Sequence, residues 1–184
     1  MTGGPGERLT IARLDALPDA EARTLLASCC GSRAWVGEML ARRPFGSSDA
    51  LLTAAAEIWW SLAPDDRREA FDHHPRIGER DAAIGQGERA EAWSREEQGE
   101  LHVAKDGVRS ELARANREYE ERFGHIYLVS ASGKSAEELL ATLRARLSND
   151  PAAELLVAAG EQAKITAIRL DRLVNGADER SEGK

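Results

Sequence analysis

The sequence predicts an all-α protein: a single-domain helical bundle of about seven helices with one short extended segment near residues 126–131. Apolar residues recur three and four positions apart over most of the chain, which is the spacing of one helix face. Residues that typically start helices, mainly Ser, Asp and Pro, separate these stretches from one another. The β-prone stretch 125–130 has no evident strand partner, so we expect it to pack against helices rather than join a sheet.

Four helices are predicted in the first part of the chain, over residues 18–31, 32–43, 47–62 and 64–74. Gly31 is expected to end the first as a left-handed cap, and Ser32 to cap the start of the second. The fourth has to stop at His74, because the residue before a proline, here Pro75, resists the helical region.

Three further helices are predicted over residues 94–122, 135–147 and 151–174. The first of these begins with Ser94-x-x-Glu97, the pattern of a capping box, and the second with the similar Ser135-x-x-Glu138. The charged, glycine-containing stretch 76–92 is predicted to be a long loop. The polar ends 1–8 and 177–184 are predicted to be disordered tails, which leaves 9–176 as the folded domain.

The composition argues against several classes of partner. A net charge of -7 repels nucleic-acid phosphates, and no apolar run approaches the ~18 residues of a membrane span. Residues 1–7 lack the order of a secretory signal, and the neighbouring Cys29 and Cys30 are expected to be reduced core residues. We therefore expect a cytoplasmic protein that binds neither nucleic acid nor membranes. An anionic ligand would require arginines that reverse the field locally.

Polar residues with chemical potential gather in two places, at His74 and at Ser94 to Gln98. His74 ends a predicted helix, where the dipole favours a protonated imidazole and burial favours a neutral one. Ser94 and Glu97 can cap their helix, orient a histidine, or do both, and the Gln98 amide can donate to a carbonyl. His73, His102 and His125 are interpreted as structural.

Two other features have alternative interpretations. Adjacent histidines point in different directions on a helix and no His-x-x-x-His occurs, so zinc is disfavoured for the set His73, His74, His102 and Glu97. Arg169 shares a helix face with Ile165 and Leu173, and either extends to water or grips a carboxylate. No phosphate-binding loop, dinucleotide fingerprint or serine nucleophile elbow is present, which indicates a helical site without a cofactor.

The order of several short motifs resembles one known family, the 2-oxo-4-hydroxy-4-carboxy-5-ureidoimidazoline (OHCU) decarboxylases of urate degradation. The resemblance covers nearly the whole predicted domain. Its motifs are Arg43-Pro44-Phe45, His74-Pro75-Arg76-Ile77-Gly78, Ser94-Arg95-Glu96-Glu97-Gln98, Asn116-x-x-Tyr119, Arg122-Phe123-Gly124, the segment 127–131 and Ile168-Arg169-Leu170. Each motif alone is weak, whereas this order and spacing are specific.

The resemblance implies a carboxy-lyase that forms (S)-allantoin, works as a homodimer without metal or organic cofactor, and is linked functionally to urate oxidase and hydroxyisourate hydrolase. It implies that His74 is the acid/base and Glu97 its partner. The substrate-binding residues that it implies are Pro75, Ser94, Arg95, Glu96, Glu97, Gln98, Tyr127, Leu128, Val129, Ser130, Ala131 and Arg169.

Two positions depart from the family pattern. His125 stands where many members have an aromatic residue, and Ser130 stands where a cysteine is usual. Neither position is among the residues assigned to proton transfer. The alternatives from other functional classes are a helical protein-interaction module without catalysis and a metal-dependent hydrolase.

Overall fold

The structure is a computed structural model that describes residues 9–77, 87–97 and 106–175. Within these ranges the chain is helical and has no strand, which confirms the all-α prediction. Nine helices are described: α1 (Ile11–Ala16), α2 (Asp19–Cys29), α3 (Arg33–Ala41), α4 (Ser48–Ser61), α5 (Pro64–Asp72), α6 (Glu88–Glu97), α7 (Asp106–Phe123), α8 (Ala136–Arg146) and α9 (Pro151–Asn175). The predicted tails lie outside the described residues.

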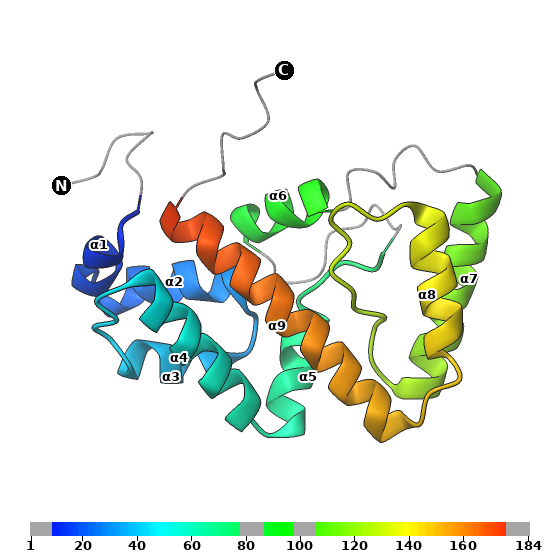
Figure 1. Cartoon of the computed structure of the whole chain (residues 1–184), viewed down its shortest axis with the longest axis horizontal. Helices are drawn as coiled ribbons and strands as arrows, with labels where there is room; N and C mark the ends of the chain where they lie inside the picture. Colours follow the sequence, from blue (N-terminus) through cyan, green and yellow to red (C-terminus); the bar gives the residue numbers. More distant parts are fainter. Residues whose placement is uncertain (1–8, 78–86, 98–105, 176–184) are drawn as a thin grey trace, which may run out of the picture.

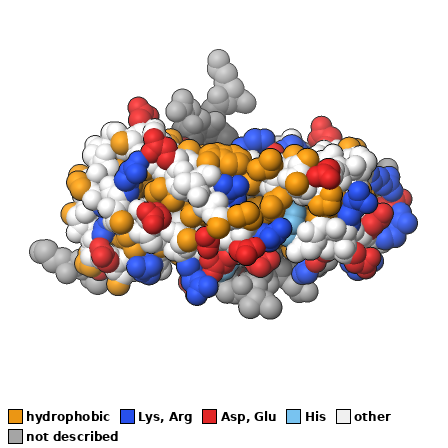
Figure 2. Space-filling model, turned by 90° about the horizontal axis from the view of Figure 1, so that it is seen from below, with side chains coloured by type: hydrophobic (Ala, Val, Ile, Leu, Met, Phe, Trp, Pro, Cys, Tyr) orange, Lys and Arg blue, Asp and Glu red, His pale blue; other side chains and the backbone are white. Residues whose placement is uncertain are grey.

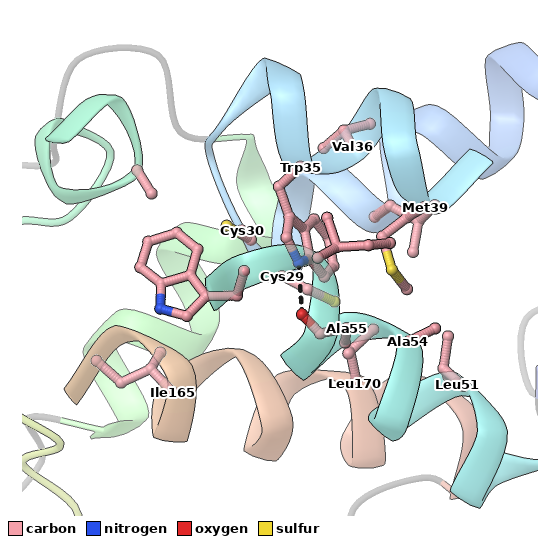
Figure 3. Packing of buried hydrophobic residues seen from close by; sticks show 14 of the residues in the cluster. Cys29, Cys30, Trp35, Val36, Met39, Leu51, Ala54, Ala55, Ile165 and Leu170 are labelled. Atoms are coloured by element: carbon pink, nitrogen blue, oxygen red, sulfur yellow. Dashed lines mark hydrogen bonds between the residues drawn. The ribbon is translucent and has the colours of Figure 1, made fainter. Parts of the chain in front are cut away.

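The long helix α9 crosses the molecule diagonally, with α1 to α5 on one side and α7 and α8 on the other (Figure 1). The helices on the first side, together with α9, enclose a first core that includes Leu26, Trp35, Leu51 and Leu170 (Figure 3). The buried indole N–H of Trp35 has a hydrogen-bond partner in this core, because Nε1 donates to the Ala55 carbonyl at 3.1 Å. This core fixes α2 and α9 relative to each other, and both helices border the site described below.

A second core lies between α7 and α8 and includes Leu112, Tyr119, Leu139 and Leu143. The start of α8 is fixed by the predicted capping box: Ser135 Oγ accepts from the Glu138 amide at 3.2 Å, and Glu138 Oε2 accepts from the Ser135 amide at 2.8 Å. The predicted cap at Ser135 is therefore confirmed.

The buried segment 126–131 separates the two cores. Its side chains alternate, as an extended backbone requires: Ile126 and Leu128 belong to the first core, whereas Tyr127, Val129 and Ala131 belong to the second. The segment has no ladder partner among the described residues, and side chains satisfy part of its backbone instead. The expectation of an extended segment packed against helices is confirmed.

Several predicted boundaries are wrong. Ser94 does not start a helix, because α6 begins at Glu88 and Ser94 lies inside it. For the same reason residues 88–92 are helical rather than part of a loop; residues 78–86 of that loop and residues 98–105, which include Gln98 and His102, lie outside the described ranges. Gly31 is not a left-handed cap, since α2 ends at Cys29 and Cys30 caps it with an extended backbone (φ -145). The short helix α1 was not predicted.

None of the helices in the described ranges is long and apolar enough to cross a membrane. Cys29 and Cys30 are free and buried, and burial raises the pKa of each thiol to about 12. Both therefore stay protonated and act as core residues.

Candidate active site

The backbone at His74 is fixed by contacts that the residues before and after it make. Its amide donates to the Phe71 carbonyl at 3.0 Å, just after α5 ends. On the other side, Arg76 pairs with Glu120 of α7 through Nε and Nη2 at 2.6 and 2.8 Å. Asn116 Nδ2 then donates to the Ile77 carbonyl at 2.8 Å. The segment that carries the imidazole is thus tied to α7 as well as to α5.

The neighbouring His73 packs closely against Gly31, two residues after the end of α2. A Cβ atom added at Gly31 would be 2.3 Å from His73 Cγ, so the glycine is needed for this close approach. The ring of His73 also makes a 2.9 Å hydrogen bond between Nδ1 and the Glu69 carbonyl. This packing agrees with the structural interpretation of His73.

Arg169 is buried on α9, and its guanidinium is fixed on several partners at once. Nε and Nη2 donate to the two carboxylate oxygens of Glu97 at 3.0 and 2.9 Å, and Nη2 also donates to Ser94 Oγ at 2.9 Å. Nη1 donates to the Ser28 carbonyl at 3.4 Å. The side chain is 3% exposed, so the interpretation that it extends to water is wrong. The bidentate pair holds Glu97 and Arg169 in one plane.

The imidazole of His74 is buried and neutral. Burial, followed by the positive charge of Arg169, lowers its pKa from 6.5 to about 3, while the side-chain amide of Gln162 acts in the opposite direction. The effect of burial on the pKa is therefore larger than that of the helix dipole, which favours the protonated ring. At neutral pH the ring can accept a proton at one nitrogen and donate one from the other.

Two cavities meet at His74. The smaller has a volume of about 20 Å³ and is lined by His74, Ile77 and Ile165. The rest of its wall consists of residues predicted to bind substrate: Pro75, Ser94, Glu97, Tyr127, Leu128, Val129 and Ala131. The larger, about 490 Å³, lies on the side of α2 and α6, where Arg23, Arg33 and Arg89 accompany Arg169. Four arginines thus line the larger cavity in a protein whose net charge is -7.

The remaining predicted residues lie elsewhere. Arg95 and Glu96 are exposed on α6, and Glu96 pairs with Arg172 at 3.2 Å. The Ser130 amide donates to Glu161 Oε2 at 2.8 Å, and its side chain is not part of the small cavity. Gln98 lies outside the described residues.

Glu97 lines the small cavity with His74, the residue whose partner it is expected to be, but its hydrogen bonds go to Arg169. Both of its oxygens accept from Arg169, and among the described residues no hydrogen bond joins it to the imidazole. The charge of Glu97 is therefore used to hold the guanidinium.

Sequence reasoning missed Gln162 and Thr166, both buried on α9. Their spacing could have revealed them: residues 162, 166 and 169 follow the i, i+4, i+7 pattern of one helix face, and a face that buries three polar side chains is unusual. His125, in contrast, fills an aromatic position. Its ring lies 5.3 Å from Phe71 and 5.5 Å from Tyr119, measured between centroids.

The fold and the site define a class: an all-α enzyme with a buried neutral imidazole at the junction of two cavities and an anchored guanidinium lining the larger of them. Comparison with known proteins specifies the class. The profile of the OHCU decarboxylase family matches residues 15–171, and the chain belongs to this family, whose members are carboxy-lyases of uric acid degradation.

Individual relatives agree with this assignment. The chain is 34% identical over 146 residues to the uric acid degradation bifunctional protein TTL of Arabidopsis thaliana, covering 79% of this chain but only 45% of that protein. It is 32% identical over 132 residues to the 2-oxo-4-hydroxy-4-carboxy-5-ureidoimidazoline decarboxylase of Amia calva, covering 72% of this chain and 75% of the relative.

Solved structures show the same fold. A crystal structure of OHCU decarboxylase in the presence of (S)-allantoin superposes with a TM-score of 0.72 at 31% identity, covering 83% of this chain and 98% of that one. An (S)-allantoin synthase structure superposes with a TM-score of 0.66 at 19% identity, which supports the fold alone.

Proposed function

We propose that this chain decarboxylates 2-oxo-4-hydroxy-4-carboxy-5-ureidoimidazoline to (S)-allantoin, with His74 as the acid/base. The observation that carries the proposal is the position of His74, a buried neutral imidazole near Arg169 that lines a pocket together with Tyr127, Leu128, Val129 and Ala131. A neutral imidazole can accept a hydroxyl proton, and a guanidinium is suited to a substrate carboxylate. The family to which the chain belongs has this activity.

The reaction needs no cofactor to accept electrons. When CO₂ leaves C4, the electron pair of the broken C–C bond forms a C4=C5 double bond, and the electron pair of the C5=N bond moves to its nitrogen. That nitrogen takes up a proton from water, which replaces the proton that the carboxylic acid released on ionisation. His74 takes the proton from the C4 hydroxyl, which becomes the carbonyl of the product. The imidazolium then delivers that proton to one face of C5. The overall change is loss of CO₂ from the acid, and the single delivering face gives one enantiomer.

Arg169, Ser94 and Glu97 are proposed to bind and orient the substrate. The small cavity, at about 20 Å³, has room for little more than a water molecule, so a substrate has to reach His74 from the larger cavity or separate the walls of the small one. Glu97 lies in the wall of the small cavity and is paired with Arg169, which lines the larger one. An incoming carboxylate would therefore share the guanidinium with Glu97 rather than find it free.

The test uses the substrate made in place by urate oxidase and hydroxyisourate hydrolase, with circular dichroism reporting chiral allantoin. Positioned acid–base catalysis contributes ~10²–10⁴-fold, so His74→Asn should lose at least ~10²-fold in rate. His125→Phe is the matched control, since its ring only fills an aromatic position, and it should keep its activity. Chiral product at the normal rate from His74→Asn would show that His74 has another role.

We also propose that the protein is a cytoplasmic homodimer that works without a cofactor. Support for the assembly comes from exposed apolar side chains on α4 and α9, where Trp60 is 47%, Leu156 56% and Val157 40% exposed. Figure 2 shows hydrophobic side chains forming a band across one face of the molecule. Sedimentation of wild type and Leu156→Glu tests the assembly, with a shift to monomer expected in the variant. The buried thiols of Cys29 and Cys30 suit a reducing compartment.

A further inference from the structure

Gln162 is a fully buried side chain, and only one of its two polar side-chain atoms has a hydrogen-bond partner. Its Nε2 donates to Thr166 Oγ1 at 3.0 Å. Its Oε1 is buried and has no partner of normal hydrogen-bond geometry. An unpartnered buried carbonyl is costly, so an acceptor held in this state calls for an explanation.

The position of Gln162 on α9 explains where this oxygen is directed. Gln162, Thr166 and Arg169 share one face of the helix, and Ile165 lies beside them. Ile165 lines the small cavity together with His74, and Arg169 lines the large one together with His74. The helix α5, which delivers His74, also packs against α9. The buried face of α9 therefore faces the imidazole over about two turns.

The hydrogen bond to Thr166 determines which end of the amide remains for His74. Thr166 Oγ1 accepts from Gln162 Nε2 at 3.0 Å. With Nε2 engaged, Oε1 is the atom left for the imidazole. Gln162 also acts to raise the pKa of the His74 ring, which is the direction expected where an acceptor binds a ring N–H.

The geometry points to Gln162 as the positioning residue that selects the tautomer of His74. Gln162 holds the proton on the ring nitrogen that faces α9 and leaves the other nitrogen unprotonated. The role of that second nitrogen as the base rests on the proposed function. A triad-like orienter was expected at Glu97, whose oxygens are instead occupied by Arg169. An uncharged amide orients the imidazole while keeping it neutral, whereas a carboxylate would favour the protonated form.

The direct test is the tautomer itself, observed by long-range ¹⁵N–¹H correlation spectra of the imidazoles in the full chain. The sequence has 4 histidines, and the His74→Asn variant identifies the signals of His74. In wild type we expect one neutral tautomer. Gln162→Met, which keeps the volume but loses the acceptor, should populate both tautomers. Gln162→Glu keeps an oxygen toward the ring and should restore a single tautomer with a raised pKa.

A second pair of variants covers the case in which Gln162→Met fails to fold. Thr166→Val removes the acceptor that orients the amide and should also mix the tautomers, whereas Thr166→Ser keeps the hydroxyl and should not. An unchanged His74 spectrum in Gln162→Met or, where that variant does not fold, in Thr166→Val would overturn the inference. So would a wild type that already shows both tautomers.

The kinetic readout separates positioning from binding. In Gln162→Met we expect kcat to fall roughly 10- to 100-fold, no more than the ~10²–10⁴-fold contribution of an acid–base group itself, with KM nearly unchanged. A rise in KM with constant kcat would assign Gln162 to substrate binding and reject the inference. Mixed tautomers in Gln162→Met, found together with a wild type that does not decarboxylate OHCU, would uphold the role of Gln162 and reject the proposed function.

Discussion

At the scale of single residues, His74 shows why a titratable side chain is hard to interpret from sequence. The proline after it identified the helix end, and that part of the prediction holds, because α5 ends at Asp72. The charge state could not be derived, since it depends on burial and on Arg169, which is 95 residues further along the chain. Tertiary contacts therefore decide the chemistry of a group that local sequence only locates.

The low pKa of His74 makes stability depend on pH. The folded pKa of about 3 lies below the ordinary value of 6.5, so the unfolded chain binds the proton first. The stabilisation is complete above about pH 6.5 and is lost as the pH falls toward 3, with a slope of up to ~1.4 kcal/mol per pH unit. From about pH 7 to about pH 4.5 the wild type should lose ~2 kcal/mol more than His74→Asn, measured by urea unfolding. Parallel losses in the two proteins would contradict a neutral buried His74.

Gly31 is predicted to be essential for the placement of the His73-His74 pair. Adding a Cβ there brings it within 2.3 Å of His73 Cγ, near the backbone end of that side chain, so the α5 terminus has to shift. Gly31→Ala should lose ~1–3 kcal/mol of unfolding free energy and lower the activity. Gly37→Ala is the matched control: nothing lies within 4 Å of its Cβ, it is inside α3, and it should stabilise by ~0.5–1 kcal/mol. Equal effects from the two variants would argue against a special role for the contact.

At the scale of elements, two copies of one sequence pattern had different outcomes. Ser135-x-x-Glu138 forms a capping box, whereas Ser94-x-x-Glu97 lies inside α6 and does not start a helix. Ser94 and Glu97 are both used by Arg169, and this tertiary ion pair replaces the local cap. The local sequence pattern was thus sufficient to predict the start of α8 and insufficient to predict the start of α6. Most helices were predicted because their apolar faces and caps are local features.

The extended segment 126–131 depends on an element far from it in the sequence. Arg146 of α8 donates from Nη1 to the Leu128 carbonyl at 2.8 Å, and its guanidinium lies 4.8 Å from the centre of the Tyr127 ring. Its charge is balanced by Glu154, which is fully buried and accepts from Arg146 Nε at 2.7 Å. The wall of the small cavity is therefore held by a buried ion pair outside the site.

Replacing Arg146 by Met should be costly, because it leaves the buried Glu154 without its partner. Breaking a buried pair in this way typically loses ~3–5 kcal/mol, and the loosened segment should raise KM as well. Arg144→Met on the same helix is the control: Arg144 pairs with Glu111 at the surface, where the two side chains are 52% and 49% exposed, and less than ~1 kcal/mol should be lost. Chemical denaturation and steady-state kinetics check both effects. Similar losses in the two variants would contradict the assigned role.

At the scale of the whole molecule, the site lies where the two cores meet. His74 follows α5 of the first core, and Ile77, three residues later, belongs to the second. The segment 126–131 contributes to both cores, and α9 brings Arg169 to the same place. A ligand at this junction would contact parts of the chain that the two cores hold separately, so its binding should stabilise the fold as a whole. Sequence could not predict this, because the meeting of the two cores depends on the packing of distant segments.

Ligand-dependent stability therefore tests both the site and the enzymatic interpretation. A ligand that binds only the folded state at about 100 times its Kd adds ~2.7 kcal/mol, which for a chain of this size corresponds to a rise in Tm of roughly 5–10 °C. (S)-allantoin should produce this rise in wild type, measured by calorimetry after its Kd is determined. Arg169→Lys should abolish most of it, because an ammonium cannot reproduce the bidentate geometry. Arg172→Lys should retain it, because the partner of Arg172 in the described part of the chain is the exposed Glu96. A helical interaction module without a small-molecule site would show no rise in any of the three proteins.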